Sequence, residues 1–382
     1  MSEFTSYFNE THEQVRTTIR KFVAEHIAPH IREWEEAGTF PRELYQRAGE
    51  AGILGLGYPE HLGGIAEGDV FMKVAASEEL MRSGSGGLVA SLGSLDIALP
   101  PIVKWGSEAI QQRVVPELLR GDKIAALAIT EPNGGSDVAN VKTRAVSDGD
   151  FYRVSGAKTF ITSGIRADYY TVAVRTGGEG YGGISLLLME KGMPGFTTGQ
   201  PLQKMGWWAS DTAELFFDDV KVPKSNIIGA ENAGFFAIMT NFQMERLNLA
   251  VMANMTAQLA LEECLRYVPE RAAFGKPLSK MQVIRHKLAD MATQVEASRE
   301  FNYRVAARIQ AGIPAVKEVS MAKNFATRTS DFVTYEATQI FGGMGFMRES
   351  LVERLYRDNR ILSIGGGTHE IMNEVIAKQL GL

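Results

Sequence analysis

The order of three kinds of periodicity along the chain constrains its fold more than any other feature of the sequence. Residues 1–125 have apolar positions at helical spacing, interrupted by glycine and proline. Residues 126–235 contain short segments rich in β-branched and aromatic residues, separated by turn residues. Residues 236–382 return to helical spacing in long runs. We therefore predict an α+β protein with an N-terminal helical domain, a middle antiparallel β domain and a C-terminal four-helix bundle, divided at these residues.

Individual elements can be placed within this plan. A helix is expected over residues 8–27, where Val15, Ile19, Phe22 and Val23 form one apolar stripe. Strands of the middle domain are expected at residues 124–130, 151–164, 169–176, 182–190 and 213–223. One seam of the bundle advances in steps of four and three residues and has one small polar member, Ser298: Ile284, Leu288, Met291, Val295, Ser298, Phe301, Val305 and Ile309.

Charge and composition exclude several partners. The chain has 40 basic and 45 acidic side chains and a net charge of -5, so it lacks the excess of positive charge that binding to nucleic acid or to an anionic membrane requires. No apolar run approaches the roughly 18 residues of a membrane span, and the polar first residues have no signal core. Cys264 is the only cysteine, so no intrachain disulfide can form. We expect a cytoplasmic protein that holds an anionic substrate through local groups.

A metal site has little support in the sequence. His26 and His30 have i,i+4 spacing, which could place two imidazoles on one helix face. Pro29 lies between them and should end or kink that helix. We therefore expect no metal and interpret this segment as an exposed helix end.

Five stretches rich in glycine, hydroxyl and aromatic residues could contact a ligand, and two of them belong to the middle domain. Residues 128–137 (AITEPNGGSD) run from a strand into a Gly-Gly turn whose N–H groups can receive a diphosphate or a polar ring edge. Residues 158–164 (KTFITSG) place an aromatic and a hydroxyl two apart on a strand, so that both share one face. Taken singly, either stretch is an ordinary turn or strand.

The other three stretches lie among the C-terminal helices. Residues 271–276 (RAAFGK) offer an arginine for a phosphate and a phenylalanine for stacking on a base. Residues 339–346 (QIFGGMGF) put glycines at a helix end, where open backbone can approach a ligand. Residues 365–370 (GGGTHE) form a flexible turn before the last helix.

Together, in this order and over essentially the whole chain, the five stretches resemble the acyl-CoA dehydrogenase family. Residues 128–140 match the first signature of the family, apart from Asn140, where a smaller residue is usual. The second signature fits throughout, at Gln339, Gly342, Gly343, Gly345, Glu349, Arg354 and Asp358. The resemblance implies an FAD cofactor and a homotetramer built as a dimer of dimers.

The resemblance also assigns roles by position. It implies contacts to the flavin ring and its diphosphate from five residues: Thr130, Gly135, Ser136, Phe160 and Thr162. Phe160 stands where a tryptophan is common in the family. It implies contacts to the ADP half of an FAD bound by a neighbouring subunit from Arg271, Phe274, Gln339 and Gly343, and Thr368 and Glu370 would close the same site. Ser136 and Arg246 are expected to contact the substrate.

The catalytic base is expected at Glu245. Many members of the family carry a glutamate in the final glycine-rich turn, where this chain has Gly366. The long-chain and isovaleryl branches instead carry the base on a long helix, just before an Arg-Leu pair, and residues 244–247 (MERL) match that pattern. The resemblance therefore moves the base to Glu245 and leaves Gly366 as a catalytic backbone N–H, which would hydrogen-bond the thioester carbonyl.

The residues around Glu245 support a general base. Phe242, Leu249 and Met252 lie three before, four after and seven after Glu245, so they should share its helix face. Their apolar side chains should desolvate the carboxyl and raise its pKa towards the range that general base catalysis needs. The competing interpretation is a glutamate paired with a nearby arginine on a solvated face.

The resemblance implies a reaction and leaves alternatives open. Glu245 would remove the α-proton of an acyl-CoA thioester, the β-hydrogen would leave as hydride to FAD, and a trans-2-enoyl-CoA would form, with electrons passing to electron-transferring flavoprotein. Residues 204–217 resemble the long-chain branch, which favours medium-to-long or methyl-branched acyl groups over butyryl. Trp207 and Trp208 are unusual there and belong to a pocket mouth, a partner surface or ordinary packing. The alternatives are an oxygen-using relative, either an acyl-CoA oxidase or a flavin monooxygenase, and a flavin-binding scaffold without turnover.

Overall fold

The N-terminal domain is a layer of short helices that packs on the C-terminal bundle through α4. The computed structural model describes residues 7–65 and 69–382, so the first six residues of the polar start lie outside the described residues. The helices are α1 Glu10–Phe22, α2 Ile31–Ala37, α3 Glu43–Glu50, α4 Val70–Met81, α5 Gly86–Leu92, α6 Leu95–Ala98, α7 Pro100–Trp105 and α8 Glu108–Leu119. The break predicted at Pro29 is confirmed, because α1 continues as a π-helix over Val23–Ile27 and α2 begins only at Ile31.

The middle domain is one twisted sheet of eight strands. They are β1 Ala125–Ala128, β2 Arg144–Asp148, β3 Phe151–Thr162, β4 Tyr169–Arg175, β5 Ile184–Glu190, β6 Phe196–Thr198, β7 Thr212–Pro223 and β8 Ile227–Ile228. The order is β6-β7-β3-β2-β4-β5-β8, with β1 paired to β4. Most neighbours are antiparallel, as predicted, but β4 runs parallel to both β1 and β2. The β2–β3 hairpin lies between β1 and β4 in the sequence and provides the crossover that a parallel pair requires.

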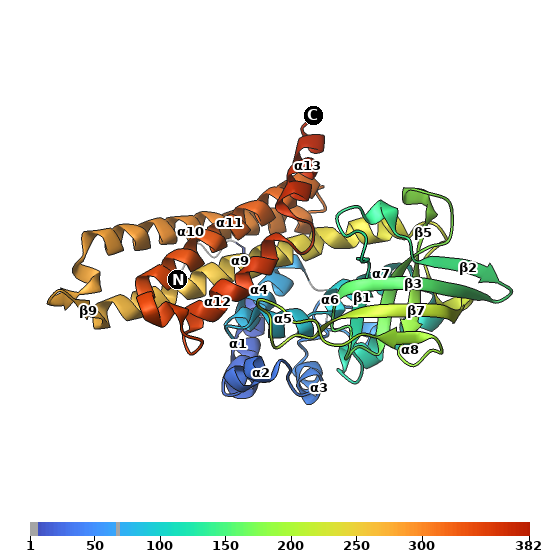
Figure 1. Ribbon diagram of the computed structural model, residues 1–382, viewed down its shortest axis with the longest axis horizontal. Helices are drawn as coiled ribbons and strands as arrows, with labels where there is room; N and C mark the ends of the chain where they lie inside the picture. Colours follow the sequence, from blue (N-terminus) through green and yellow to red (C-terminus); the bar gives the residue numbers. More distant parts are fainter. Residues whose placement is uncertain (1–6, 66–68) are drawn as a thin grey trace.

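Three long helices form the C-terminal bundle, and Figure 1 shows them side by side. They are α9 Gly234–Glu270, α10 Gln282–Gln310 and α11 Val316–Phe341. The shorter α12 Leu351–Asn359 packs against α9 and α11 as the fourth member, and a small hairpin of β9 Ala272–Ala273 and β10 Lys276–Pro277 joins α9 to α10. The predicted seam of α10 is confirmed, with its polar member Ser298 fully buried.

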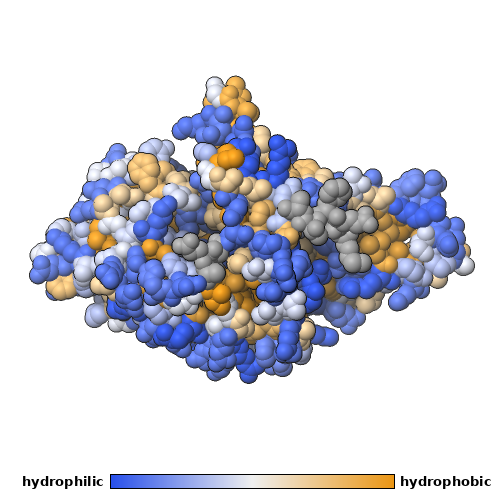
Figure 2. Space-filling view, turned by 180° about the vertical axis from the view of Figure 1, so that it is seen from behind, coloured by the Kyte–Doolittle hydropathy of each residue, from blue (hydrophilic) through white to orange (hydrophobic). Residues whose placement is uncertain are grey.

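The last helix, α13 His369–Gln379, packs on α11 and projects from the body of the molecule (Figure 1). Figure 2 shows the same projection from behind, with hydrophobic residues at its tip, where Leu380 and Leu382 are exposed. Within the described part of the chain, no single helix is long and apolar enough to cross a membrane. The segments Gly86–Leu92 and Leu95–Trp105, which are bent relative to one another, reach the length and apolar composition of a membrane span only when they are taken together.

One buried carboxylate, that of Asp358 on α12, holds the three domains together. It accepts a hydrogen bond from the N–H of Gly86 at the start of α5 (3.1 Å) and another from the N–H of Trp207 in the middle domain (2.6 Å). Burial and the nearby Glu35 carboxyl raise the pKa of Asp358. The backbones of α5 and of the Trp207 loop also lie close together here, because a Cβ on Gly87 would lie 2.7 Å from Trp207 Cα.

We therefore expect Gly87→Ala to destabilise the junction of the three domains. The added methyl group meets backbone atoms, which cannot rotate away, so overpacking of about 1–3 kcal/mol is expected. Denaturant unfolding monitored by tryptophan fluorescence measures this loss. Gly182→Ala is the matched control, because nothing lies within 4 Å of a Cβ at Gly182. Equal stability of the two variants would show that the contact at Gly87 does not constrain the domains.

Candidate active site

The carboxyl of Glu245 lies inside the molecule, on the face of α9 that looks towards the C-terminal turn. Its Oε2 atom is buried, and no group of the described residues forms a hydrogen bond with it. Leu249, one turn further along α9, is buried beside it, as the helical spacing predicted. A buried carboxylate oxygen without a partner is costly, because it has lost its hydration without gaining a donor. Such an atom marks Glu245 as a candidate for a group that acts on a ligand.

The turn before α13 faces Glu245 and is built from glycines for a geometric reason. Gly366 and Gly367 have φ values of +64° and +104°, which L side chains rarely adopt. A Cβ on Gly366 would lie 2.6 Å from Leu249 Cδ1 and 3.5 Å from Glu245 Oε1. The backbone of the turn therefore approaches the carboxyl closely, and no side chain fits between them.

Two cations hold the carbonyl groups of this turn. Arg246 Nε donates to the carbonyl oxygen of Gly366 (3.1 Å), and Lys323 Nζ, from α11, donates to the carbonyl oxygen of Gly367 (2.7 Å). The N–H of Gly366 has no hydrogen-bond acceptor among the described residues, so it is available to a ligand. The structure thus gives Arg246, which was predicted to contact the substrate, a partner within the chain.

The electrostatics of this cluster suit a general base. Burial raises the pKa of Glu245 to about 7, although the nearby Arg246 and Lys323 act in the opposite direction. Burial also lowers the pKa of Lys323 to about 8, with a further contribution from the like charge of Arg246. A carboxyl with a pKa close to neutral pH can both accept and release a proton under working conditions. The predicted desolvation of Glu245 is therefore confirmed, and the alternative of a solvated ion pair is wrong.

Glu245 also lines an apolar cavity of about 380 Å³ between the N-terminal helices and α9. Its walls come from α4, α5, α6, α7 and α9 and from residues 53–58, and the apolar side chains among them include Val74, Leu80, Val89, Leu92, Leu95 and Val251. A cavity of this size and lining is typical of a site for an extended apolar group. The carboxyl thus lies between this apolar cavity and the glycine turn.

The turn predicted to contact the flavin is held by a second buried carboxylate, that of Glu131. It accepts hydrogen bonds from the backbone N–H groups of Lys142 (2.7 Å) and Thr143 (2.9 Å) and from Lys158 Nζ (2.8 Å). The backbone of Glu131 also exchanges two hydrogen bonds with Gly134. Gly135 and Ser136 are exposed just beyond this point, so a fixed turn presents them to a ligand.

Phe160 and Thr162 lie at the end of β3, but not on a regular strand. A β-bulge between Lys158 and Ile161 adds one residue to β3, and Phe160 has φ +59° and is 68% exposed. Side chains two residues apart share a face only on a regular strand, and the bulge interrupts that alternation. A bulge redirects a side chain, and here it turns the Phe160 ring outward beside the half-buried Thr162. This end of β3 is joined to the turn at Thr130, because the N–H of Thr159 donates to the carbonyl oxygen of Thr130 (2.9 Å).

The residues predicted to contact the ADP half of FAD lie at the far end of the bundle. Arg271 caps α9, and Phe274, at the tip of the hairpin, is 96% exposed. Gln339 and Gly343 belong to the same end, because the rings of Tyr267 and Phe341 stack there at 4.1 Å. Nothing lies within 4 Å of a Cβ on Gly343, so this backbone is open.

These residues lie far from the middle domain of the same chain. The start of α9 at Gly234 packs on β5 of the middle domain, whereas its end carries the hairpin. Because a 37-residue α-helix is about 55 Å long, the two sites are separated by about that length. Figure 1 shows the middle domain at one end of the molecule and β9 at the other. Thr368 and Glu370 lie at neither end but at the start of α13, where the Thr368 hydroxyl caps the helix.

The chemistry of these groups fits FAD. An outward aromatic ring, hydroxyl groups and a fixed turn with open backbone suit a flat ring with a polar edge, and an exposed arginine with open glycine backbone suits a diphosphate. The unpartnered oxygen of Glu245 and the N–H of Gly366 suit a thioester beside that ring. The residues present are therefore compatible with FAD held by more than one chain.

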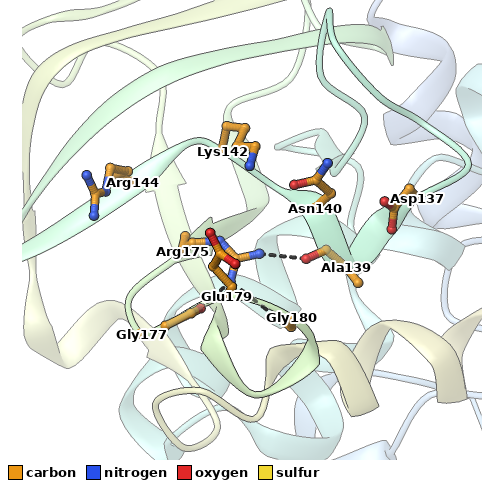
Figure 3. Close-up of a pocket in the computed structure, with 10 residues that line it drawn as sticks. Asp137, Ala139, Asn140, Lys142, Arg144, Arg175, Gly177, Glu179 and Gly180 are labelled. Atoms are coloured by element: carbon orange, nitrogen blue, oxygen red, sulfur yellow. Dashed lines mark hydrogen bonds between the residues drawn. The ribbon is translucent and has the colours of Figure 1, made fainter.

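A polar recess flanks the flavin turn, and Figure 3 shows how one arginine organises it. The Arg175 guanidinium donates to the carbonyl oxygens of Ala139 (2.6 Å), Val141 (2.7 Å) and Gly180 (3.2 Å), and so joins two loops. The recess shares no lining residue with the apolar cavity at Glu245. Arg175 therefore stabilises the segment that follows Ser136.

The two tryptophans take part in the packing between domains. Trp207 has φ +56° and packs against the glycines at the start of α5. Trp208 lies between two guanidinium groups, with Arg348 Cζ 4.0 Å and Arg357 Cζ 3.7 Å from its ring centre. Of the interpretations left open by the sequence, packing at the domain junction is the one that these contacts support.

Sequence reasoning missed Lys323 and the role of Asp358. Lys323 is fully buried and occupies the seam of α11, between Val319 and Ala326 at steps of four and three. A lysine at a seam position is a signal that the sequence contained, because lysine is almost never fully buried without a partner. The role of Asp358 had no such signal, since its partners come from two other domains.

Comparisons with known proteins agree with this geometry. Models of the acyl-CoA dehydrogenase N-terminal, middle and C-terminal domains match residues 9–122, 126–220 and 232–381. A long-chain specific acyl-CoA dehydrogenase of Sus scrofa mitochondria is 40% identical over 376 residues, which cover 98% of this chain and 87% of the relative.

Two solved structures extend the comparison to the fold. A probable acyl-CoA dehydrogenase from Mycobacterium abscessus superimposes with a TM-score of 0.96 at 52% identity, covering 98% of this chain and 100% of the other. An acyl-CoA dehydrogenase from Bacillus anthracis, solved in complex with FAD, has a TM-score of 0.92 at 30% identity, covering 98% of this chain and 68% of the other.

Proposed function

We propose that this chain, which belongs to the acyl-CoA dehydrogenase family and is an FAD-dependent enzyme of that family, converts an acyl-CoA thioester to its trans-2-enoyl-CoA with Glu245 as the base. The observation that carries the proposal is the buried Oε2 atom of Glu245, which has no partner in the described residues and lies between an apolar cavity and the Gly366 turn, whose N–H has no acceptor in the described residues.

Each part of the site has a proposed task. The apolar cavity would bind the acyl chain and exclude water from the reacting carbons. The N–H of Gly366 would donate to the thioester carbonyl and stabilise the negative charge that develops there. Glu245 Oε2 would accept the α-proton. Bound FAD would supply the chemistry that this chain lacks, by accepting the β-hydrogen as hydride.

Electron-transferring flavoprotein is the proposed acceptor of the two electrons, as the family resemblance implies. An oxygen-using relative and a scaffold without turnover are the alternatives. Anaerobic bleaching of the flavin by acyl-CoA distinguishes an enzyme from a scaffold, and oxygen consumption during turnover distinguishes an oxidase from a dehydrogenase. Rapid bleaching without oxygen consumption is the expected result.

The first test of the base is Glu245→Gln. The amide keeps the shape of the side chain but cannot accept a proton at neutral pH, so flavin reduction should slow by about 10²–10⁴-fold. Binding of FAD and of acyl-CoA should be unchanged. Anaerobic stopped-flow spectroscopy of the flavin measures the rate. A near-normal rate would place the base elsewhere.

The double variant Glu245→Gln/Gly366→Glu is the matched test of the turn. It puts a carboxylate where other members of the family keep theirs, but φ is +64° there and a Cβ would lie 2.6 Å from Leu249 Cδ1. We therefore expect no recovery of flavin reduction. Recovery would show that the turn can move.

Substrate preference follows from the apolar cavity. Its walls are mostly apolar over five helices, so longer chains should gain binding energy of about 0.8 kcal/mol for each buried CH₂ group. We expect kcat/KM to be higher for medium-to-long or methyl-branched acyl-CoA than for butyryl-CoA. A substrate panel with an acceptor dye measures this preference, and an optimum at four carbons would contradict it.

Sharing of FAD between subunits of a homotetramer is proposed from the two separated sets of residues. Arg271→Ala should lower FAD affinity, because a hydrogen bond to a charged phosphate is typically worth about 1.5–3 kcal/mol. The loss should increase on dilution if the phosphate belongs to a neighbouring subunit's FAD. Flavin retention across a dilution series, with the oligomeric state measured in parallel, tests this, and equal retention at all concentrations would count against it.

A further inference from the structure

Lys323 is an unusual residue for a helix core. Its side chain is fully buried on α11, yet within the described residues its ammonium group donates to only one acceptor, the carbonyl oxygen of Gly367 (2.7 Å). Its Cε atom lies 3.7 Å from the position of a Cβ on Gly366, and Glu245 Oε1 lies 3.5 Å from the same point. Lys323 and Glu245 therefore approach the same glycine from two different helices.

The other charged groups around Glu245 can be identified helix by helix. Arg246 lies next to it on α9 and donates to Gly366. His369, at the start of α13, contacts the Thr327 hydroxyl (3.2 Å). Lys73 of α4 and Asp96 of α6 line the same cavity but form an ion pair with one another (2.6 Å), and Lys104 of α7, at the same cavity, lies over the ring of Trp105 (4.8 Å). Arg246 and Lys323 are thus the two cations that act on Glu245.

We propose that Lys323 is a positioning residue for the reaction, whose buried ammonium both clamps the Gly366–Gly367 turn beside Glu245 and keeps the Glu245 carboxylate charged so that it can act as a base. The inference rests on the proposed function in taking Glu245 as the base, and it adds a residue on a separate helix that controls it.

The physical reason is the balance of burial and charge. Burial alone favours the neutral form of a carboxyl, and a base must be ionised before it can take a proton. An opposite charge nearby commonly lowers a carboxyl pKa by about 1–3 units. Arg246 is held on one side of the turn, and Lys323 provides the second cation from the other side.

Lys323 differs from a purely structural residue in a measurable way. A residue that only packs would change stability, whereas Lys323 should also change the pH at which Glu245 ionises. Without the ammonium the pKa of Glu245 should rise above its value of about 7. The acidic limb of the pH profile should then move to higher pH.

The experiment uses the FAD-loaded enzyme and four variants. Lys323→Met removes the charge and the hydrogen bond, Lys323→Gln removes the charge but keeps a donor for Gly367, and Lys323→Arg keeps the charge. Asn324→Leu is the matched control, because Asn324 is also buried on α11 and bonds the backbone of His369 (3.2 Å), but carries no charge.

Two readouts are measured across pH. The first is the rate of anaerobic flavin reduction by acyl-CoA. The second is infrared difference titration of the Glu245 carboxyl without substrate, assigned by comparison with Glu245→Gln. For Lys323→Met and Lys323→Gln, we expect the midpoint of the pH–rate profile and the midpoint of the infrared titration to rise by about one pH unit. Fewer Glu245 carboxyls are then ionised at pH 7, so the rate there should fall by about five-fold. Lys323→Arg and Asn324→Leu should titrate as the wild type does.

The outcomes separate this inference from the proposed function. If the infrared titration moves but acyl-CoA never reduces the flavin, Lys323 controls Glu245 and the proposed reaction is wrong. If flavin reduction is normal and neither uncharged variant moves the titration, the inference is overturned. An equal shift in Asn324→Leu would also overturn it, because the effect would then arise from loosened packing. Lys323→Gln keeps the test decisive if Lys323→Met does not fold.

Discussion

The carboxylate of Asp358 is the interaction on which the arrangement of this protein depends. Through two backbone N–H groups it connects α12 to the start of α5 and to the Trp207 loop of the middle domain. None of the three domains supplies the whole candidate site: the apolar cavity lies between the N-terminal helices and α9, while the turn at Glu131 belongs to the middle domain. Backbone contacts around Gly87 leave little room for adjustment, so the relative position of the domains is determined at this junction.

Glu131 and Glu245 show how the surroundings of a carboxyl change its protonation. Burial alone would raise the pKa of Glu131, but Lys158 and the hydrogen bonds from Thr143 lower it, so this carboxylate remains charged and organises a turn. Glu245 is half-buried, but its Oε2 atom is enclosed without a donor among the described residues, and burial of the carboxyl raises its pKa to about 7. The difference lies in the hydrogen-bond donors, and it separates a structural carboxylate from a reactive one.

Long elements with a clear period were predictable from the sequence, and elements that exist only through pairing were not. The expected strands at 151–164 and 213–223 correspond to β3 and β7, whereas β6 and β8 have three and two residues and no period of their own. The desolvation of Glu245 was predictable because its neighbours lie on the same helix. The clamp from Lys323 and the bulge at Phe160 were not, because each depends on contacts with a distant segment.

The position of the Glu245 carboxyl, the proposed base, and the conformation of the last turn fit each other. With the carboxyl on α9, Gly366 needs no side chain, and its backbone can adopt φ +64° and approach Glu245 Oε1. That conformation in turn directs two carbonyl groups towards Arg246 and Lys323 and leaves the Gly366 N–H without an acceptor in the described residues. A glutamate at this position would strain the backbone and meet Leu249. The glycine that appears at first to remove the catalytic group is therefore consistent with the proposed base on the helix.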